Sequence, residues 1–226
     1  MRPERINHSQ ELSEGNESLA EVTFSPIDEE DISTIMDIEE ELYPDPSLEE
    51  EDLEDMIDDP SFDLYSFLIH VDGREDPVGY CMATEQDEPE HFDLEPGKKS
   101  IYLEDIGIIR EGRQGGETSR KAFTEFMSRV KRGGVDLVEM EARAETSYKL
   151  LVGKDGKGGA WQEIAKKYGY SVVRDESDVY TDESGTYYWV GLRRSEELDE
   201  GDDEAMRGSN KTGRRVFDLF GRLKEK

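Results

Sequence analysis

The sequence predicts a mixed α+β fold over residues 21–194, with a mostly antiparallel, twisted sheet of about seven strands and about four helices. Two stretches carry this prediction. Residues 100–142 have the pattern of a strand, a glycine-rich loop, a helix and a strand within roughly 40 residues, the spacing of a right-handed parallel crossover. Residues 170–193 have the pattern of a closing pair of strands, and a chain of 226 residues has room for one such domain with extensions.

Two acidic helices follow the first strand, which we expect at residues 22–27. Asp28 is placed to cap the first helix. The apolar residues of that helix at helical spacing are Ile32, Ile35, Met36 and Leu42. We expect the second helix over residues 47–58, because Ser47 and Glu50 have the spacing of a capping box.

Strands dominate the middle of the chain. Residues 64–71 and 77–85 are predicted to form a hairpin. The acidic loop 86–99 leads to a long strand at residues 100–109, in which Gly107 indicates a bulge or a close approach of another group to the backbone.

One long helix and several shorter elements complete the domain. The long helix begins near Thr118, and its apolar residues at helical spacing are Ala122, Phe123, Phe126, Met127 and Val130. The remaining elements are a strand at 135–142, short helices at 145–151 and 160–168, and strands at 170–174 and 186–193.

The two ends of the chain differ from the domain in composition. We expect residues 1–20 to form a flexible arm, because they are polar and lack a hydrophobic pattern. Residues 195–208 are predicted to be an acidic linker, and residues 209–226 a basic amphipathic helix. That helix can dock on a protein partner or fold back onto its own acidic domain, and the sequence does not choose between the two.

Charge is the most unusual bulk property, because 57 acidic and 28 basic side chains give a net charge of -29. Such a field repels nucleic acid and anionic membranes, so we expect neither as a partner. The charge is compatible with a cationic partner or a small amine, but charge runs usually form solvated faces, so a soluble or salt-adapted surface is the favoured explanation. The sequence contains no apolar run of about 18 residues and its start has no signal-peptide pattern, so we expect a cytoplasmic protein.

Cysteine and histidine usage argues against metal or disulfide chemistry. Cys81 is the single cysteine, which excludes an intrachain disulfide and a cysteine-rich zinc site. His8, His70 and His91 are scattered along the chain. We therefore expect no metal.

The glycine-rich stretch at residues 113–118 has the features of a phosphate-binding loop. A helix N-terminus offers unpaired N–H groups and a positive dipole end, and glycines let a phosphate approach them. Arg113 adds a positive charge, and the hydroxyls of Thr118 and Ser119 can donate to phosphate oxygens. The stretch lacks the Gly-Lys-Ser/Thr ending of a nucleotide P-loop and the spacing of a dinucleotide fingerprint. A diphosphate-bearing ligand is one prediction, and a plain turn or helix cap is the alternative.

The run Arg113-Gln114-Gly115-Gly116-Glu117 fits the first five places of the pattern Arg or Gln, any two residues, Gly, any residue, Gly or Ala. Thr118 departs from the sixth place. The run resembles the signature of the GNAT superfamily of N-acetyltransferases, and the order of elements over residues 22–193 is similar to that family's fold. The strand segment Tyr102-Leu103-Glu104-Asp105-Ile106 resembles polyamine-type members of the family.

The resemblance implies acetyl-CoA as cosubstrate, and a small amine or a protein amine as acceptor. The pantetheine arm would pair with the backbone of Ile106, Gly107 and Ile108. The diphosphate would bind the loop and helix start, which are Arg113, Gln114, Gly115, Gly116, Thr118 and Ser119. Direct attack of the amine on the thioester needs a base for the amine's proton and a donor for the leaving thiolate.

Glu104 is the leading candidate for the base, because it takes the place that matches the polyamine-type enzymes. We expect Glu104 and Asp105 to point to opposite faces of their strand, with Glu141 on the neighbouring strand in reserve. A carboxylate that is solvated, or paired with Arg143 or a lysine, is the alternative.

The thiolate donor is less defined. The family's tyrosine position before the Gly169-Tyr170 pair is Ala165 here. Tyr168 and Tyr148 are the substitutes, although tyrosines in such helices are commonly core residues. These departures keep a second function open, in which a catalytically weak or inactive module docks to a partner protein through residues 209–226.

Overall fold

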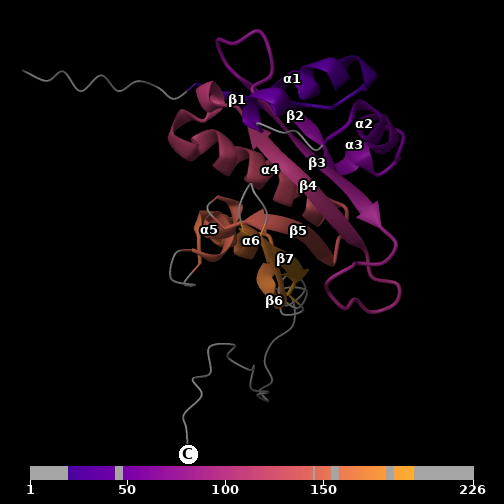
Figure 1. The fold of residues 1–226 in the computed structure, drawn as a ribbon. Coiled ribbons are helices and arrows are strands. Elements are labelled where there is room, and N and C mark those ends of the chain that lie inside the picture. Colours follow the sequence, from indigo (N-terminus) through magenta and orange to yellow (C-terminus); the bar gives the residue numbers. More distant parts are fainter. Residues whose placement is uncertain (1–19, 44–47, 145, 154–157, 182–185, 196–226) are drawn as a thin grey trace, which may run out of the picture. The chain divides into compact units, whose positions relative to one another are not determined.

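The computed structural model describes residues 20–43, 48–144, 146–153, 158–181 and 186–195. Their strands form one seven-stranded sheet in the order β1-β2-β3-β4-β5-β7-β6 (Figure 1). The strands are β1 Val22–Ser25, β2 Phe67–Val71, β3 Gly79–Gln86, β4 Ser100–Ile108, β5 Leu137–Arg143, β6 Tyr170–Thr181 and β7 Thr186–Arg194. Neighbouring strands are antiparallel except β4 and β5, which are parallel and joined through α4. The predicted mixed fold, with its single parallel crossover, is confirmed.

The described part of the chain contains six α-helices, where the sequence predicted about four. They are α1 Ile32–Leu42, α2 Glu50–Ile57, α3 Phe62–Tyr65, α4 Glu117–Arg132, α5 Ser147–Val152 and α6 Ala160–Lys167. Short 3-10 turns occur at Glu29–Asp31, Arg110–Gly112 and Gln114–Gly116.

The predicted strand at residues 64–71 is wrong in its first part. Residues Phe62–Tyr65 form the helical turn α3, and the strand begins at Phe67. Phe62 and Tyr65 are both fully buried, and their spacing of three residues brings them to one face of a helical turn. Leu64, which the strand prediction included, is 54% exposed.

The helix caps partly follow the prediction. The Asp28 side chain accepts a hydrogen bond from the N–H of Glu30 at 2.9 Å, in a capping box with Asp31. The capping box of α2 is formed by Glu49 and Asp52, so the predicted role of Glu50 is wrong, and its predicted partner Ser47 lies outside the described residues. An acidic segment offers several residues with capping-box spacing, and the sequence pattern selected the wrong pair.

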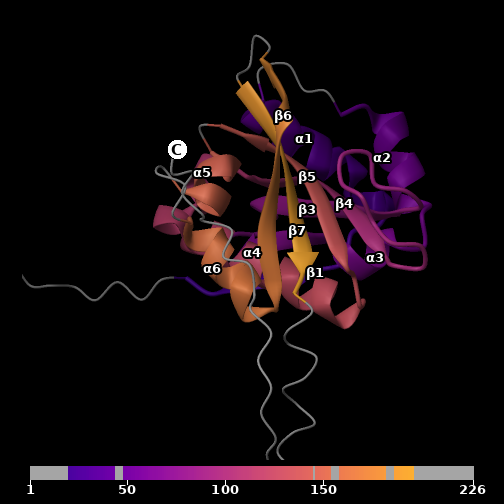
Figure 2. The same ribbon diagram turned by 90° about the horizontal axis from the view of Figure 1, so that it is seen from below.

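Two hydrophobic cores hold the helices on the two faces of the sheet (Figure 2). The α4-side core packs α4, α5 and α6 on the sheet, and it includes the stacked pair Phe123 and Trp161, whose ring centroids lie 4.3 Å apart. The α1-side core packs α1 and α2 on the opposite face around Ile35, Leu53 and Phe62. Burial of these apolar side chains supplies the main stabilisation of the domain.

Some predictions about the chain ends lie outside the described residues. These are the flexible arm at residues 1–20, apart from Ala20, and the basic helix at 209–226. The acidic linker at 195–208 is described only at Ser195. Strand β6 runs to Thr181, beyond the predicted end at residue 174, with a register shift between Asp175 and Val179.

Candidate functional site

Strands β4 and β5 separate halfway along their length. They pair from Ser100 with Leu137 to Leu103 with Met140, and no further. Beyond that point β4 continues along β3, and β5 continues along β7. The β5-facing edge of residues 104–108 therefore has no strand partner among the described residues. Such an edge offers backbone N–H and C=O groups to an extended ligand. Ile106, Gly107 and Ile108, the predicted pantetheine contacts, lie on this stretch.

A β-bulge lies where the two strands separate. Met82 of β3 pairs with Asp105 and Ala83 pairs with Leu103, so Glu104 is the extra residue of the bulge. The sequence placed a bulge or a close approach at Gly107, and the structure shows the close approach there. A Cβ at Gly107 would come within 2.7 Å of the Tyr80 hydroxyl oxygen.

The bulge overturns the expectation that Glu104 and Asp105 point to opposite faces. Leu103 before them belongs to the α4-side core, and Ile106 after them packs against that core. In a regular strand residues 103 and 106 would face opposite sides, and the inserted residue cancels that alternation. Both carboxyl groups are therefore turned away from the α4-side core.

The carboxyl group of Glu104 has the proton affinity of a base that works near neutral pH. Its side chain is exposed, yet the surrounding protein displaces part of the water around the carboxyl group. This desolvation, followed by the charges of Asp105 and Glu141, raises the pKa of Glu104 from its ordinary 4.5 to about 7. A carboxylate with this pKa is suited to accept a proton at physiological pH.

The carboxyl group of Asp105, unlike that of Glu104, is held by hydrogen bonds from two tyrosines. Its Oδ2 accepts hydrogen bonds from the hydroxyl of Tyr43 at 2.6 Å and from the hydroxyl of Tyr80 at 3.1 Å. Tyr80 also contacts the carboxyl group of Glu39, which is 4% exposed. Burial raises the pKa of both Asp105 and Glu39 above the ordinary values. Sequence reasoning missed Glu39, although its spacing from Ile32 and Ile35 places an acid on the apolar face of α1.

The neighbouring strand adds a second row of carboxyl groups on the same face. Val138, Met140 and Ala142 belong to the α4-side core, so Glu139 and Glu141 of β5 face the other way. Glu139 is fully buried and accepts hydrogen bonds from the backbone N–H groups of Glu90 at 3.0 Å and His91 at 2.6 Å. These bonds hold the acidic loop 86–99 against β5. The position of Glu139 in the middle of an otherwise apolar strand was the sequence signal that could have indicated its structural role.

Aromatic rings lie on that same face. The His91 ring stacks on the indole of Trp189 with 3.5 Å between ring centroids, and the Tyr102 ring lies 6.2 Å from that indole. Trp189 of β7 pairs with Glu141 of β5. The face of the sheet beside the strand separation is therefore both acidic and aromatic, a combination that attracts cations.

The glycine-rich loop forms a backbone cradle. Gln114, Gly115 and Gly116 have φ angles of 39°, 64° and 93°, so three successive residues adopt the left-handed region. Successive N–H groups in such turns converge on a concave, anion-binding surface. A Cβ at Gly115 or Gly116 would meet no atom within 4 Å, so the loop faces open space. The cradle continues into the N-terminus of α4, which spans 16 residues.

One buried polar group at the loop has no partner. Both polar atoms of the Gln114 side-chain amide are buried without a hydrogen bond. Buried polar groups are normally satisfied, and this amide is an exception among the described residues of the loop. The donors that the loop offers are its backbone N–H groups, which suit a diphosphate.

Three predicted phosphate contacts serve the loop itself. The hydroxyl of Thr118 is buried and donates to the carbonyl of Gly112 at 2.5 Å, so its predicted donation to phosphate is wrong. That hydrogen bond accommodates a threonine where the family pattern has Gly or Ala. The Ser119 hydroxyl donates to the carbonyl of Gly116 at 3.0 Å, and Arg113 Nε donates to the carbonyl of Ile108 at 3.0 Å. The first-turn N–H groups of α4 have no intrahelical acceptor, so they are the groups suited to a phosphate.

The two candidate tyrosines lie at opposite ends of the sheet. Tyr148 lies in α5, directly after the end of β5 at which the strands separate. Its ring stacks on Tyr188 at 4.2 Å, and its hydroxyl accepts a hydrogen bond from Arg174 at 3.2 Å. Tyr168 follows α6 and precedes Tyr170, whose hydroxyl donates to the carbonyl of Val135 at 2.5 Å.

The structure therefore places the segment of Tyr168 at the end of β5 that lies away from the opening, and its role as thiolate donor stays a prediction. Val135 precedes β5, whereas the strands separate after Met140, about 16 Å further along an extended chain. The sequence places Tyr168 at the end of the helix in which the family has its tyrosine. It does not show in which direction that helix, α6, runs relative to the opening. Ala165, at the family's tyrosine position, is fully buried in the α4-side core.

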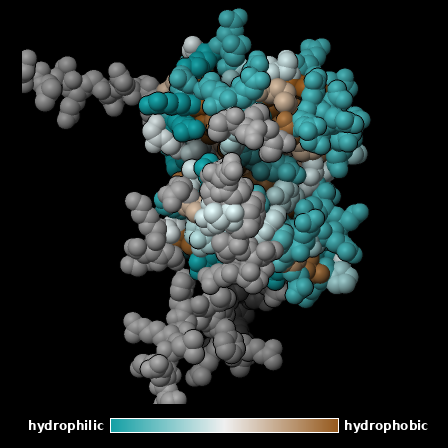
Figure 3. Space-filling view, in the orientation of Figure 1, coloured by the Kyte–Doolittle hydropathy of each residue, from teal (hydrophilic) through white to brown (hydrophobic). Residues whose placement is uncertain are grey.

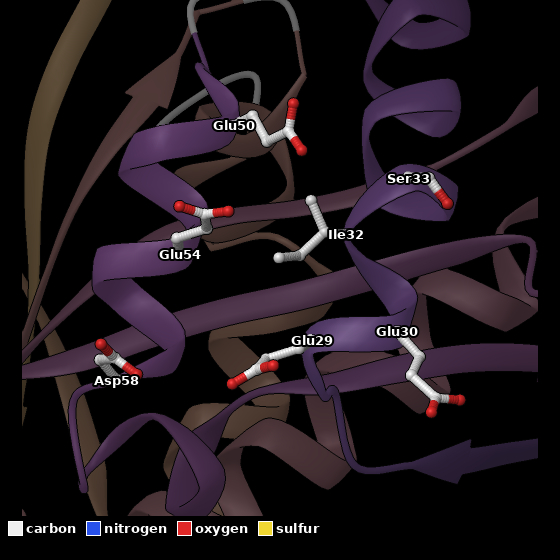
Figure 4. A pocket seen from close by; sticks show the side chains of 7 residues that line it. All are labelled: Glu29, Glu30, Ile32, Ser33, Glu50, Glu54 and Asp58. Carbon is white, nitrogen blue, oxygen red and sulfur yellow. The ribbon is translucent and has the colours of Figure 1, made fainter.

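A surface hollow of about 480 Å³ lies elsewhere, between the start of α1 and α2 (Figure 4). Its lining residues are Glu29, Glu30, Ile32, Ser33, Glu50, Glu54 and Asp58. Helix α1 extends about 16 Å from this hollow to Tyr43, which lies beside Asp105. The hollow is thus separate from the opening between β4 and β5.

The described residues bring together no group of three or more His, Cys, Asp and Glu side chains that could hold a metal ion. Within the same residues no helix has both the length and the apolar character needed to cross a bilayer. On the face drawn in Figure 3, hydrophilic side chains cover most of the described surface.

Solved structures share this fold at low sequence identity. The NatC complex bound to Gag peptide and CoA matches with a TM-score of 0.54 and 14% identity, covering 77% of this chain and 99% of that one. NAA60 of Arabidopsis thaliana in complex with acetyl-CoA matches with a TM-score of 0.52 and 15% identity, covering 76% of this chain and 99% of that one. The loading GNATL domain of CurA from Lyngbya majuscula matches with a TM-score of 0.55 and 13% identity, covering 76% of this chain and 98% of that one.

No protein-family model matches the sequence, and no curated protein sequence matches it significantly. The sheet order, the parallel crossover and these structural neighbours together show that the chain has the GNAT fold. They give no support to the polyamine-type subgroup.

The carboxyl groups of this site make stability depend on pH. The pKa values of Glu39, Glu104 and Asp105 are all raised in the folded protein, so it binds more protons than the unfolded chain above pH 4.5. The free energy of unfolding therefore falls as the pH rises from 4.5 through about 7, the folded-state pKa of Glu104. Urea denaturation at pH 5 and pH 8, at equal high ionic strength, measures the difference. Equal stability, or higher stability at pH 8, would contradict it.

Proposed function

We propose that the chain is an N-acetyltransferase, which transfers the acetyl group of acetyl-CoA to an amine by direct attack. One observation carries this proposal: an exposed carboxyl group of raised pKa, Glu104, stands at a bulge where β4 and β5 separate. The same strand leads through residues 109–112 into the anion-binding cradle at Gln114–Gly116. A base and a diphosphate cradle thus lie at the two ends of one strand edge.

The described residues fit acetyl-CoA at both of its recognition elements. The cradle at Gln114–Gly116 and the first N–H groups of α4 would hold the diphosphate. The unpaired edge of β4 at Ile106, Gly107 and Ile108 would hold the amide groups of the pantetheine arm. The CoA and acetyl-CoA complexes among the structural neighbours support this assignment.

The residues of the chain would then handle two protons. The amine nitrogen forms a bond to the acetyl carbon while the carbon–sulfur bond breaks, and the attacking nitrogen loses a proton to the carboxylate of Glu104. The leaving thiolate takes up a proton from a donor at the same end of the sheet. Tyr148 is the candidate donor, because its hydroxyl lies on the element that follows β5.

The acceptor side favours a molecule that carries a positive charge in addition to its neutral attacking amine. Glu104 and Glu141 supply carboxyl groups there, and Tyr102 and Trp189 supply aromatic faces. Ammonium groups bind to both kinds of surface. We include polyamines, small cationic metabolites and protein amines in this class.

A coenzyme A release assay with a panel of amines tests the proposed function. Cys81, the single cysteine, is fully buried, so a thiol reagent will detect released coenzyme A without a strong background from the protein. We expect release that depends on an amine, and an increase in Tm of about 5–10 °C at a hundredfold excess of acetyl-CoA over its Kd. Absence of both the release and the thermal shift would refute the proposal.

Residues 209–226 are a further part of the proposal, as a segment that docks on a protein partner. The charge pattern of the sequence supports it, because a basic amphipathic segment follows an acidic domain. A pull-down with the full chain and with a chain lacking these residues would compare the partners retained.

A further inference from the structure

Four side-chain oxygen groups form a continuous chain beneath the candidate base. The Tyr80 hydroxyl contacts Oε1 of Glu39 on one side and Oδ2 of Asp105, at 3.1 Å, on the other. The Tyr43 hydroxyl contacts the same Oδ2 of Asp105 at 2.6 Å. The four residues come from α1, its C-cap, β3 and β4, so the chain ties α1 to the sheet beside the bulge.

Counting protons shows that this chain contains one more than its hydroxyl groups supply. Each of the three oxygen–oxygen contacts needs one proton between its two oxygens. The two tyrosines provide two, because burial and the nearby carboxyl groups raise the pKa of both phenols well above 10. A third proton on one of the carboxyl groups completes the chain, and Glu39 and Asp105 then bear a single negative charge between them.

The hydrogen-bond donors around each carboxyl group decide where that charge resides. Asp105 accepts from the Tyr43 hydroxyl and from the backbone at Ile106, and both interactions favour its ionised form. Glu39 is 4% exposed, and Tyr80 is its one side-chain hydrogen-bond partner among the described residues. Tyr80 has one hydroxyl proton and contacts both carboxyl groups, so these partners favour Glu39 as the neutral acid that donates to Tyr80, with Tyr80 and Tyr43 both donating to ionised Asp105.

We propose that Asp105 is a positioning residue for the reaction assigned to Glu104. Asp105 and Glu39 share one proton through Tyr80, and this arrangement keeps a negative charge on Asp105. That charge lies beside Glu104 and favours a proton on the Glu104 carboxyl group. This inference rests on the proposed function for its catalytic meaning, but the shared proton does not depend on that function. The other groups that face this network are Glu141 of β5, which acts on Glu104, and Tyr187 of β7, which acts on Tyr43.

The first experiment follows the titration of the Glu104 carboxyl group by NMR in protein labelled with ¹³C at glutamate side chains. The Glu104→Gln variant identifies the resonance. We expect Asp105→Asn to lower the titration midpoint by about one pH unit, because it removes the neighbouring charge. We expect Glu39→Gln to leave the midpoint in place, because the amide replaces an acid that is already neutral. An unchanged midpoint in Asp105→Asn, or an equal decrease in Glu39→Gln, would overturn the proposal.

The second experiment detects the shared proton directly. The infrared spectrum is recorded at pH 7 in the Glu104→Gln background, because Glu104, with a pKa of about 7, would itself be partly protonated there. It should contain the carbonyl stretch of a protonated carboxylic acid. Glu39→Gln should remove that band, and the matched change at an exposed position of α2, Glu51→Gln, should retain it. A band that survives in Glu39→Gln would overturn the assignment, even if Asp105→Asn fails to fold. Neither experiment measures acetyl transfer, so failure of the proposed function and failure of this inference are distinguishable.

Discussion

The Glu104→Gln variant should lower kcat for acetyl transfer by about 10²–10⁴-fold, the usual contribution of a positioned general base. Glutamine has nearly the shape of glutamate but cannot accept the proton of the attacking amine. Glu104 is an exposed, extra residue of a bulge, so the substitution leaves the pairing of β3 with β4 intact. Binding of acetyl-CoA at Gln114–Gly116 does not involve the Glu104 side chain, and the thermal shift should be retained.

Initial rates of coenzyme A release at saturating amine measure the effect, and Glu51→Gln on the exposed face of α2 is the matched control. The control has the same change in charge and should keep full turnover. Turnover of Glu104→Gln equal to that of the control would remove Glu104 from the role of base and leave Glu141 as the candidate.

The Gly116→Glu variant should reduce the thermal shift by acetyl-CoA to about 1 °C under the same conditions, because we expect its affinity to fall by about two orders of magnitude. Gly116 has a φ of 93° and faces open space at the N-terminus of α4. A glutamate there places a negative charge where the diphosphate would bind, and its side chain fills the cradle. Isothermal titration with coenzyme A gives the affinity directly.

Gly134 provides the matched control for that variant. It lies just beyond the opposite end of α4, has a φ of 67°, and also faces open space. Gly134→Glu therefore introduces the same side chain, a similar backbone strain and the same charge at a distance from the cradle. Equal losses of coenzyme A affinity in the two variants would show that strain, and not a ligand site at the cradle, is responsible.

The parts of the fold that could be predicted from the sequence are those with strong local signals. The strands at 22–27 and 135–142 and the long helix after the glycine loop have clear hydrophobic periods, and each is present with its ends displaced by a few residues. The phosphate-type loop was likewise visible, because glycines at positions of positive φ are a local requirement.

The rest of the site depends on relations between distant residues. Nothing local in Leu103, Glu104 and Asp105 marks a bulge, since the extra residue is defined only by the register of β3. Asp105 meets Tyr43 and Tyr80, which are 62 and 25 residues away.

The role of Thr118 likewise depends on a contact that the sequence does not show. The hydroxyl was a reasonable phosphate donor from its position in the sequence. Its acceptor, the carbonyl of Gly112, lies six residues back and is brought close by two successive 3-10 turns. Only the folded loop shows that the hydroxyl is already used.

The dependence of kcat/KM on pH tests the central claim most directly. The acceptor should be an amine whose own pKa lies well below 7, so that it stays neutral over the range studied and only the enzyme titrates. For the wild-type chain we expect kcat/KM to rise with pH through a midpoint near 7, the pKa of Glu104, and we expect Glu104→Gln to lack this step. A wild-type midpoint near the ordinary 4.5 of a glutamate, or a step near 7 that persists in Glu104→Gln, would contradict the account.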